Sequence, residues 1–213
     1  MSVAIIGAIA RENVRLGGIS RYTQGWETRG NGQRSNYGGI LLHHTAGGRN
    51  VNIDQILING RWDLAGPLCN FCIMYDGDIG VIAAHPANHA GASGGWDTSP
   101  FARTGLFNSQ IIGVEIQYPG TEPMAQVQYE AAKRLTNATL NVLGKPRDYR
   151  WAKFHQGTSI EGKWDPGYHP SGKTYSIAQF RKDCAGMPAA AGENPDSPTW
   201  QDNRFQLLGS KAA

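Results

Sequence analysis

The sequence predicts a single α/β domain with a central mixed β-sheet and helices on its faces. The chain has 213 residues, enough for one substantial hydrophobic core, and this length does not require a second domain. Short apolar runs bounded by glycine, asparagine and aspartate are typical of buried strands. A long segment beginning near residue 123 has apolar side chains three and four positions apart, which indicates a helix with one face on the sheet.

The composition argues against two classes of protein. Hydrophobic residues make up 40% of the chain and charged residues 17%, as in a folded soluble protein. The net charge of +3 is too small for the basic surface of a nucleic-acid-binding protein, and no apolar run reaches the length of a transmembrane helix. We therefore expect neither a nucleic-acid partner nor insertion into a membrane.

The two ends of the chain differ from its middle. Residues 1–35 predict an N-terminal arm packed across a domain that occupies 36–186. The arm starts with an apolar stretch and an Ala-x-Ala pattern but lacks the basic region of a secretion signal, so we expect no signal peptide and folding in a cytoplasm. Residues 187–213 predict a linker and a short apolar tail.

The elements of the sheet follow one another along the domain. The expected strands are 39–44, 69–75, 79–84, 111–117 and 151–155. The first is continuously apolar, which favours a central position, and the second and third flank an Asp-Gly-Asp turn, which predicts a hairpin.

Helices are expected at three places, and a long loop at a fourth. Residues 51–58 fit either a helix or a strand, and we favour a helix. The clearest helix opens at Pro123 and ends at Gly144, and a further one covers 174–184. The glycine-rich loop 85–108 has no periodicity, and a loop of this length in a compact domain is usually functional.

The three cysteines cannot all pair within one chain, so we expect free thiols. Cys69 and Cys72 form a C-x-x-C pattern, which could be half of a zinc ribbon or a redox motif. No second pair completes a ribbon, and the surrounding run is apolar, which favours a place in the core.

One set of side chains fits a hydrolytic zinc site. Such a site uses three histidine or carboxylate ligands and leaves one position to a water, whose pKa the metal lowers toward neutrality. His43 ends the first strand, and His155 and Asp165 lie in a stretch whose glycines and proline favour a shaped loop. Any single histidine is more often a hydrogen-bonded structural residue. His44 faces away from His43, because adjacent residues of a strand point to opposite sides.

Two further groups could complete a mechanism. Glu115 stands alone in an apolar strand and could accept the proton of the attacking water and pass it to a leaving amine. The alternative is a member of a buried ion pair. Lys163 could stabilise the negative charge of a tetrahedral intermediate, although a lone lysine on a loop is more often a solvated surface residue.

Five blocks in order resemble the type 2 N-acetylmuramoyl-L-alanine amidases, a family of phage lysins, bacterial anhydro-muropeptide amidases and animal peptidoglycan recognition proteins. They are 41–46, the hairpin with its Asp-Gly turn, 88–91, 112–115 and 155–167. The resemblance spans roughly residues 36–185. It implies the fold of that family and assigns roles by position. The implied zinc ligands are His43, His155 and Asp165, the acid/base is Glu115, the oxyanion stabiliser is Lys163, and the substrate contacts are Asn88 and His89.

The resemblance implies zinc-dependent hydrolysis of the amide between N-acetylmuramic acid and L-alanine in bacterial peptidoglycan. The expected setting is a monomeric phage endolysin that stays in the host cytoplasm until a partner opens the membrane. Two alternatives remain open: a module that binds peptidoglycan without cutting it, and a regulatory protein partner in addition to the enzyme. His169 is a rival to Asp165 as third ligand, although the Lys-x-Asp-Pro-Gly pattern favours Asp165. The family commonly has a histidine in the strand that corresponds to residues 69–72, but this chain reads Cys-Asn-Phe-Cys there.

Overall fold

The computed structural model describes residues 1–187 apart from 34, 146–147, 169–171 and 173–175. Its centre is a six-stranded sheet with the strand order β1-β6-β5-β7-β2-β8. The strands are β1 (Ser20–Tyr22), β2 (Ile40–His44), β5 (Phe71–Ile73), β6 (Ile79–Val81), β7 (Ile112–Ile116) and β8 (Ala152–Phe154). Every neighbouring pair is parallel except β5 and β6, which form the expected antiparallel hairpin. The prediction of a mixed sheet is confirmed.

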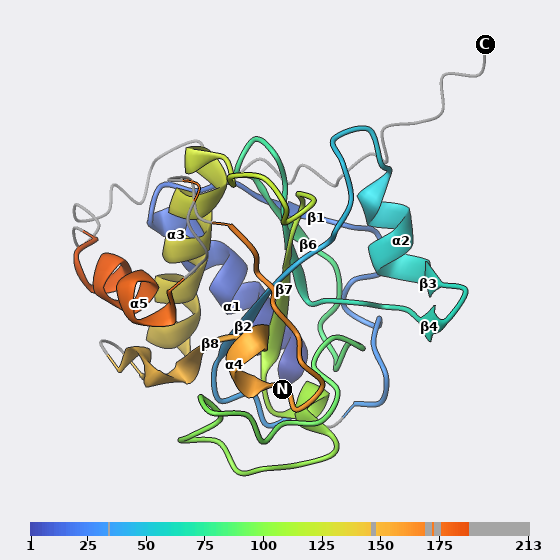
Figure 1. Cartoon of the computed structure of the whole chain (residues 1–213). Helices are drawn as coiled ribbons and strands as arrows, with labels where there is room; N and C mark the ends of the chain where they lie inside the picture. The colour runs from blue at the N-terminus through green and yellow to red at the C-terminus, as the bar shows by residue number, and fades with distance from the viewer. Residues whose placement is uncertain (34, 146–147, 169–171, 173–175, 188–213) are drawn as a thin grey trace.

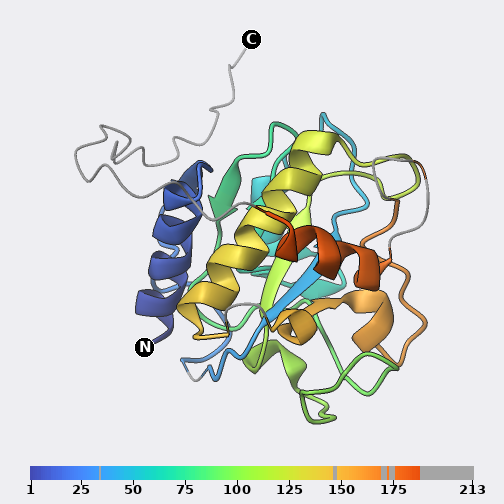
Figure 2. The ribbon, with the colours of Figure 1, turned by 90° about the vertical axis from the view of Figure 1, so that its left-hand side faces the viewer.

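Three helices cover one face of this sheet: α1 (Ser2–Arg15), α3 (Gln126–Val142) and α5 (Ile177–Ala185). Figure 2 shows α1 and α3 side by side in front of the strands. The main core lies between the helices and the sheet, where Ile40 and Leu42 of β2 meet Leu135 of α3 and Phe180 of α5. The prediction of helices that pack on the sheet is confirmed.

The opposite face is covered by shorter segments. Helix α2 (Ile53–Asn59) packs over Cys69 and Cys72, and the loop that leads to β7 packs Phe107 on Leu41. A small hairpin of β3 (Gly60–Arg61) and β4 (Leu64–Ala65) follows α2 at the edge of the molecule (Figure 1). Residues 51–58 therefore contain a helix, as favoured from the sequence. Alternation along β2 places Leu41 and His43 on this face and Ile40 and Leu42 on the other.

Two helices start later than the sequence indicated. Pro123, expected at the start of α3, forms a β-bridge with Tyr168, and the amide of Met124 donates to the Tyr168 carbonyl at 3.2 Å. This pairing holds the segment extended, so α3 begins only at Gln126. Helix α5 begins at Ile177, after Ser176 accepts a hydrogen bond from the Gln179 amide.

The first 35 residues contribute both a helix and a strand. The apolar start forms α1, whose buried side chains Ile6 and Ile9 belong to the main core, and β1 extends the sheet beside β6. None of the described helices is long and apolar enough to cross a membrane. The expected linker and tail at 188–213 lie outside the described residues.

All three cysteines are buried and free. Cys69 and Cys72 belong to the small core under α2, and Cys184 belongs to the main core. Burial raises the pKa of each thiol well above its ordinary value. The prediction of unpaired core cysteines is confirmed.

Candidate metal and catalytic site

The parallel pairing of β2 with β7 places two polar side chains next to each other. His43 is opposite Glu115 in this register, so both point to the face of the sheet that the three long helices leave free. His43 is 2% exposed. The strand ends of β2 and β7 thus bring together a histidine and a carboxylate that are 72 positions apart in the sequence.

The second histidine and the aspartate come from the other side of β2. Strand β8 pairs with β2 and is followed at once by the short helix α4 (His155–Thr158), whose first residue is His155. The chain then returns, and the Gln156 amide donates to the Asp165 carbonyl at 3.0 Å. Tyr118, just beyond β7, donates its hydroxyl hydrogen bond to the carbonyl of Pro166. These two contacts hold Asp165 beside the histidines.

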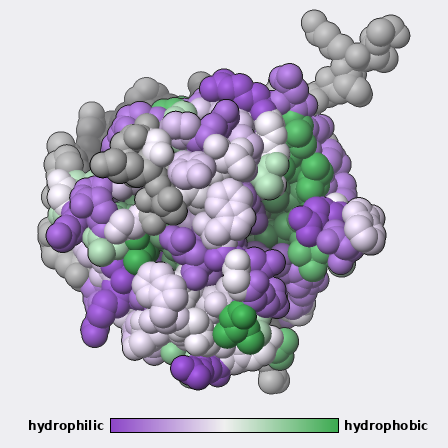
Figure 3. Space-filling view, in the orientation of Figure 1, coloured by the Kyte–Doolittle hydropathy of each residue, from purple (hydrophilic) through white to green (hydrophobic). Residues whose placement is uncertain are grey.

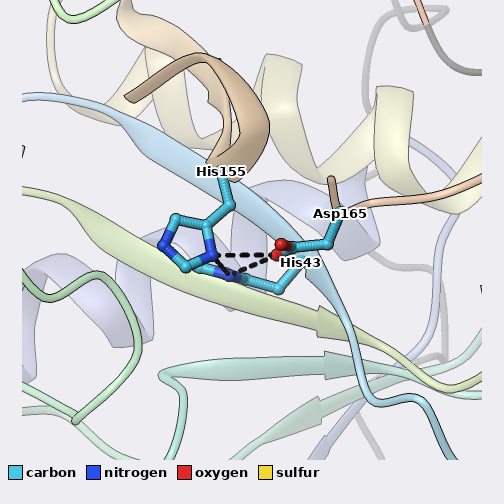
Figure 4. A group of neighbouring side chains, drawn as sticks. All are labelled: His43, His155 and Asp165. Atoms are coloured by element: carbon cyan, nitrogen blue, oxygen red, sulfur yellow. Dashed lines mark hydrogen bonds and ion pairs between the residues drawn. The ribbon is translucent and has the colours of Figure 1, made fainter. Parts of the chain in front are cut away.

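Three donor atoms form a nearly equilateral triangle (Figure 4). Nδ1 of His43 lies 3.1 Å from Nδ1 of His155, and Oδ2 of Asp165 lies 2.9 Å from the first and 3.0 Å from the second. Hydrogen bonds alone cannot satisfy all three sides, because each Nδ1 carries at most one proton. A single cation in contact with all three atoms would satisfy them together.

The charge states of these groups suit a cation. Burial, and after it the positive field of His155, lowers the pKa of His43 to about 4, so its imidazole is neutral at pH 7. Burial opposes ionisation of Asp165, but the hydrogen bonds from His155 and His43 outweigh it and hold the pKa of that carboxyl well below its usual range. The cluster therefore presents one neutral imidazole and one carboxylate before any metal binds.

Glu115 has a different environment. Its Oε2 atom is buried and has no hydrogen-bond partner among the described residues. Burial, followed by the negative field of Asp165, raises the pKa of Glu115 well above its ordinary value. Two carboxyl groups with pKa values displaced in opposite directions, at one site, are typical of a catalytic acid/base beside a binding group.

The sequence matches a known family over most of this domain. The family described as N-acetylmuramoyl-L-alanine amidase matches residues 33–168, which is more than half of the chain and includes every residue of the cluster. The chain belongs to this amidase family. No curated protein sequence matches it.

Solved structures share the fold of this amidase. The N-acetylmuramoyl-L-alanine amidase LysC from Clostridium intestinale URNW has a TM-score of 0.53 at 15% identity, over 78% of this chain and 97% of that one. A selenomethionine derivative of AmpD has a TM-score of 0.53 at 19% identity, over 80% and 96%. The endolysin amidase LysCS from Clostridium intestinale URNW gives 0.50 at 18%, over 78% and 95%. The predicted family and fold class are confirmed.

The other residues expected at the site of the amidase are placed as follows. Lys163 forms an ion pair with Glu161 at 3.6 Å, and 46% of its side chain is exposed. Asn88 donates from Nδ2 to the Ala65 carbonyl at 2.9 Å, which ties the loop to β4. His89 lies against the cluster itself, with Nδ1 3.1 Å from Nε2 of His43. His169, the rival ligand, lies outside the described residues.

Two aromatic residues near the site were not found from the sequence. The Trp164 ring packs at a tilt against His44 with ring centroids 4.6 Å apart, and Tyr118 packs edge-on against the same imidazole at 5.8 Å. His44 thus points away from the cluster, as the alternation of a strand requires. Nothing in the sequence pattern marks Tyr118, because its contribution is a contact with Pro166, 48 positions later.

Proposed function

We propose that this amidase is zinc-dependent and hydrolyses the amide between the lactyl group of N-acetylmuramic acid and L-alanine of the peptidoglycan stem peptide. The observation that carries the proposal is the triangle of His43, His155 and Asp165 donor atoms beside Glu115. Two imidazole nitrogens, one carboxylate oxygen and an open position are the ligand set of hydrolytic zinc enzymes.

The residues fit zinc in spacing and in chemistry. Ligands of a tetrahedral zinc site lie about 3.3 Å apart when the bonds are about 2.0–2.1 Å long. The separations of 2.9–3.1 Å between the donor atoms are close to this value. Hard divalent ions such as calcium instead prefer sites built of oxygen ligands.

The protein groups supply the remaining chemistry. Bound zinc supplies Lewis acidity toward the scissile carbonyl and lowers the pKa of a water ligand. Glu115 takes a proton from the attacking water and delivers it to the nitrogen of the departing L-alanine. The rise in its pKa, caused first by burial, makes this carboxylate a better proton acceptor than an exposed one. Lys163, whose ammonium lies 3.6 Å from Glu161 here, is the residue that we assign to stabilise the developing oxyanion.

We place the stem peptide in a cavity on this face of the sheet, although neither Glu115 nor the three metal-binding residues line it. A cavity of about 530 Å³ lies between the segment that follows β2 and the turn that follows β5. Its lining includes Arg49, Asp54, Tyr75 and Gln117, the last only two residues beyond Glu115. The face in Figure 3 is hollowed beside an apolar strip, which suits an extended peptide. Asn88 and His89 are the proposed contacts on the loop side.

We propose an endolysin as the biological setting. LysCS, which is similar in fold, is described as an endolysin, and the chain belongs to the N-acetylmuramoyl-L-alanine amidase family. In this setting the enzyme waits in the cytoplasm of the infected cell, as a monomer, and reaches peptidoglycan once the membrane is opened.

The proposal is tested on purified peptidoglycan with the full chain. We expect release of stem peptides with a free N-terminal L-alanine, loss of this product in excess chelator, and recovery when zinc is added. Asp165→Ala should lose both bound zinc and product, while His85→Ala, a histidine outside the cluster, should keep both.

Two results would overturn the proposal. Full activity of a metal-free sample in chelator would exclude zinc dependence. Binding to the wall without any new N-terminal alanine would show a recognition module in place of an enzyme of this specificity.

A further inference from the structure

The imidazole of His89 contacts the imidazole of His43 edge-on. Its Nδ1 lies 3.1 Å from Nε2 of His43, and the two rings meet nearly at right angles, with 81° between their planes and centroids 5.2 Å apart. The His43 contact is made by the nitrogen that faces away from His155 and Asp165. The His43 ring thus contacts His155 and Asp165 through Nδ1 and His89 through Nε2.

The location of His89 is fixed by its neighbours. Asn108 accepts hydrogen bonds from the amides of His89 at 3.2 Å and Ala90 at 2.7 Å, which anchors the backbone of this loop. The ring lies over the backbone of β7 at Gly113, where an added Cβ atom would come within 2.5 Å of the ring carbons. Glycine at this position leaves the space that the imidazole fills.

From this geometry we infer that His89 is a positioning residue for His43, which it holds in the tautomer that binds metal. A neutral imidazole has one N–H and one lone pair. In the metal-free protein Nδ1 of His43 can give its hydrogen to Asp165, so metal binding requires the other tautomer. If Nε2 of His43 then carries the hydrogen and donates it to Nδ1 of His89, the lone pair of His43 is on Nδ1 and points into the triangle. Hydrogen bonds of this kind on the far nitrogen orient metal-binding histidines and raise their basicity. The inference rests on the proposed zinc function.

This role differs from a direct contact with substrate. The two roles separate in the measurements that they affect: a positioning residue changes the affinity of the protein for metal in the absence of substrate, whereas a substrate contact changes KM and leaves metal affinity alone.

The test compares three substitutions of His89 in the full chain. His89→Phe keeps a ring but removes the acceptor, and zinc affinity, measured by competition with a chromophoric chelator, should fall about 10–100-fold. His89→Asn can place Oδ1 where Nδ1 lies, and it should bind zinc about tenfold or more tightly than His89→Gln, whose carbonyl is one bond farther from the backbone. His85→Ala is the histidine control and should match the wild type.

A second readout is the hydrogen bond itself in the zinc-loaded protein. Nitrogen NMR of the wild type should show a coupling between Nε2 of His43 and Nδ1 of His89 across the shared proton, with that proton bonded to Nε2 of His43. If His89→Phe does not fold, the comparison of Asn with Gln and this coupling in the wild type decide the question.

The outcomes distinguish the inference from the proposed function. Equal zinc affinity in wild type and His89→Phe, or in the Asn and Gln variants, overturns the inference alone. A zinc-loaded wild type in which the shared proton is bonded to Nδ1 of His89, or in which no coupling joins the two rings, also overturns it. A wild type that binds no zinc overturns the proposed function and, with it, this role of His89.

Discussion

Glu115 has a buried oxygen atom that no described residue hydrogen-bonds, and it lies in the negative field of Asp165. Replacing it by glutamine keeps the size of the side chain and removes its ability to accept a proton. We expect Glu115→Gln to fold, to bind zinc like the wild type and to hydrolyse peptidoglycan about 10²–10⁴-fold more slowly, the usual loss for a general acid/base. Turnover and metal content on the same sample check this, and a rate within a few-fold of wild type would remove the assigned role.

The same substitution has an effect on stability that depends on pH. The pKa of Glu115 is higher in the folded than in the unfolded chain, where it is about 4.3. The folded state therefore binds more protons between these two values, and the stability that this carboxyl contributes below pH 4.3 is lost as the pH rises through the folded pKa.

We accordingly expect metal-free Glu115→Gln to gain stability over metal-free wild type as the pH is raised from about 4 to 8. Denaturant unfolding of both proteins across this range measures the difference. Curves that stay parallel would show that Glu115 titrates at its ordinary value. A widening gap would show that the wild type keeps a carboxyl at this place at the expense of its own stability.

The sequence predicts a site residue when a local pattern marks it, and it does not when the role of that residue depends on contacts with distant segments. His43 and His155 lie next to the ends of apolar runs, and the glycines around Asp165 mark a shaped loop, so the ligand set can be proposed from pattern and resemblance. The contact of His89 with His43 depends on Gly113 and Asn108, which lie on two other segments. No local pattern reports a contact that needs four segments to be in place. For Lys163, the ion pair with Glu161 leaves the expected role untested.

At the scale of elements, the loop 85–108 is held by a buried ion pair. Asp97 accepts from Nζ of Lys153 at 3.1 Å and from Arg181 at 2.8 Å, so it joins the loop to β8 and α5. Lys153 is fully buried, and burial lowers its pKa to about 8. The loop that covers Leu41 and carries His89 is therefore fixed to β8, the strand that leads directly into His155.

We expect Asp97→Asn to destabilise the protein by on the order of 3 kcal/mol, because it leaves the Lys153 ammonium buried without a counter-charge. Asp63→Asn is the matched control: the pair of Asp63 with Arg61 is exposed, and its loss should cost less than about 0.5 kcal/mol. Denaturant unfolding at pH 7 measures both. Equal effects of the two substitutions would contradict the anchoring role of Asp97.

Element boundaries show where local patterns stop being sufficient. The apolar spacing of α3 and the β-branched run of β7 are strong local signals, and both elements form where expected. Pro123 is a favourable first residue of a helix, yet here it pairs with Tyr168 across a bridge. Propensity is a weak guide when a distant segment offers the backbone hydrogen bonds instead.

At the scale of the whole molecule, residues 1–35 take part in the same core as the catalytic domain. Ile6 and Ile9 of α1 are fully buried in the main core, which they share with Leu135 of α3, and β1 is the edge strand beside β6. The sequence predicts only an arm packed across the domain, because a short apolar stretch with few charges does not show which surface it covers. The partner surface, α3, lies more than a hundred residues later.

This packing predicts that the catalytic fold depends on its N-terminal helix. We expect Ile9→Ala to destabilise the protein by about 2–5 kcal/mol, the cost of truncating a buried isoleucine. Ile19→Ala removes the same atoms from a side chain that is 52% exposed, and it should cost less than about 0.5 kcal/mol.

A chain that starts at residue 36 should lack the cooperative unfolding transition of the full protein, because it loses β1 and uncovers the apolar face of α3. A truncated chain that unfolds cooperatively, near the full-length midpoint, and still cuts peptidoglycan would show that the domain is complete without this helix.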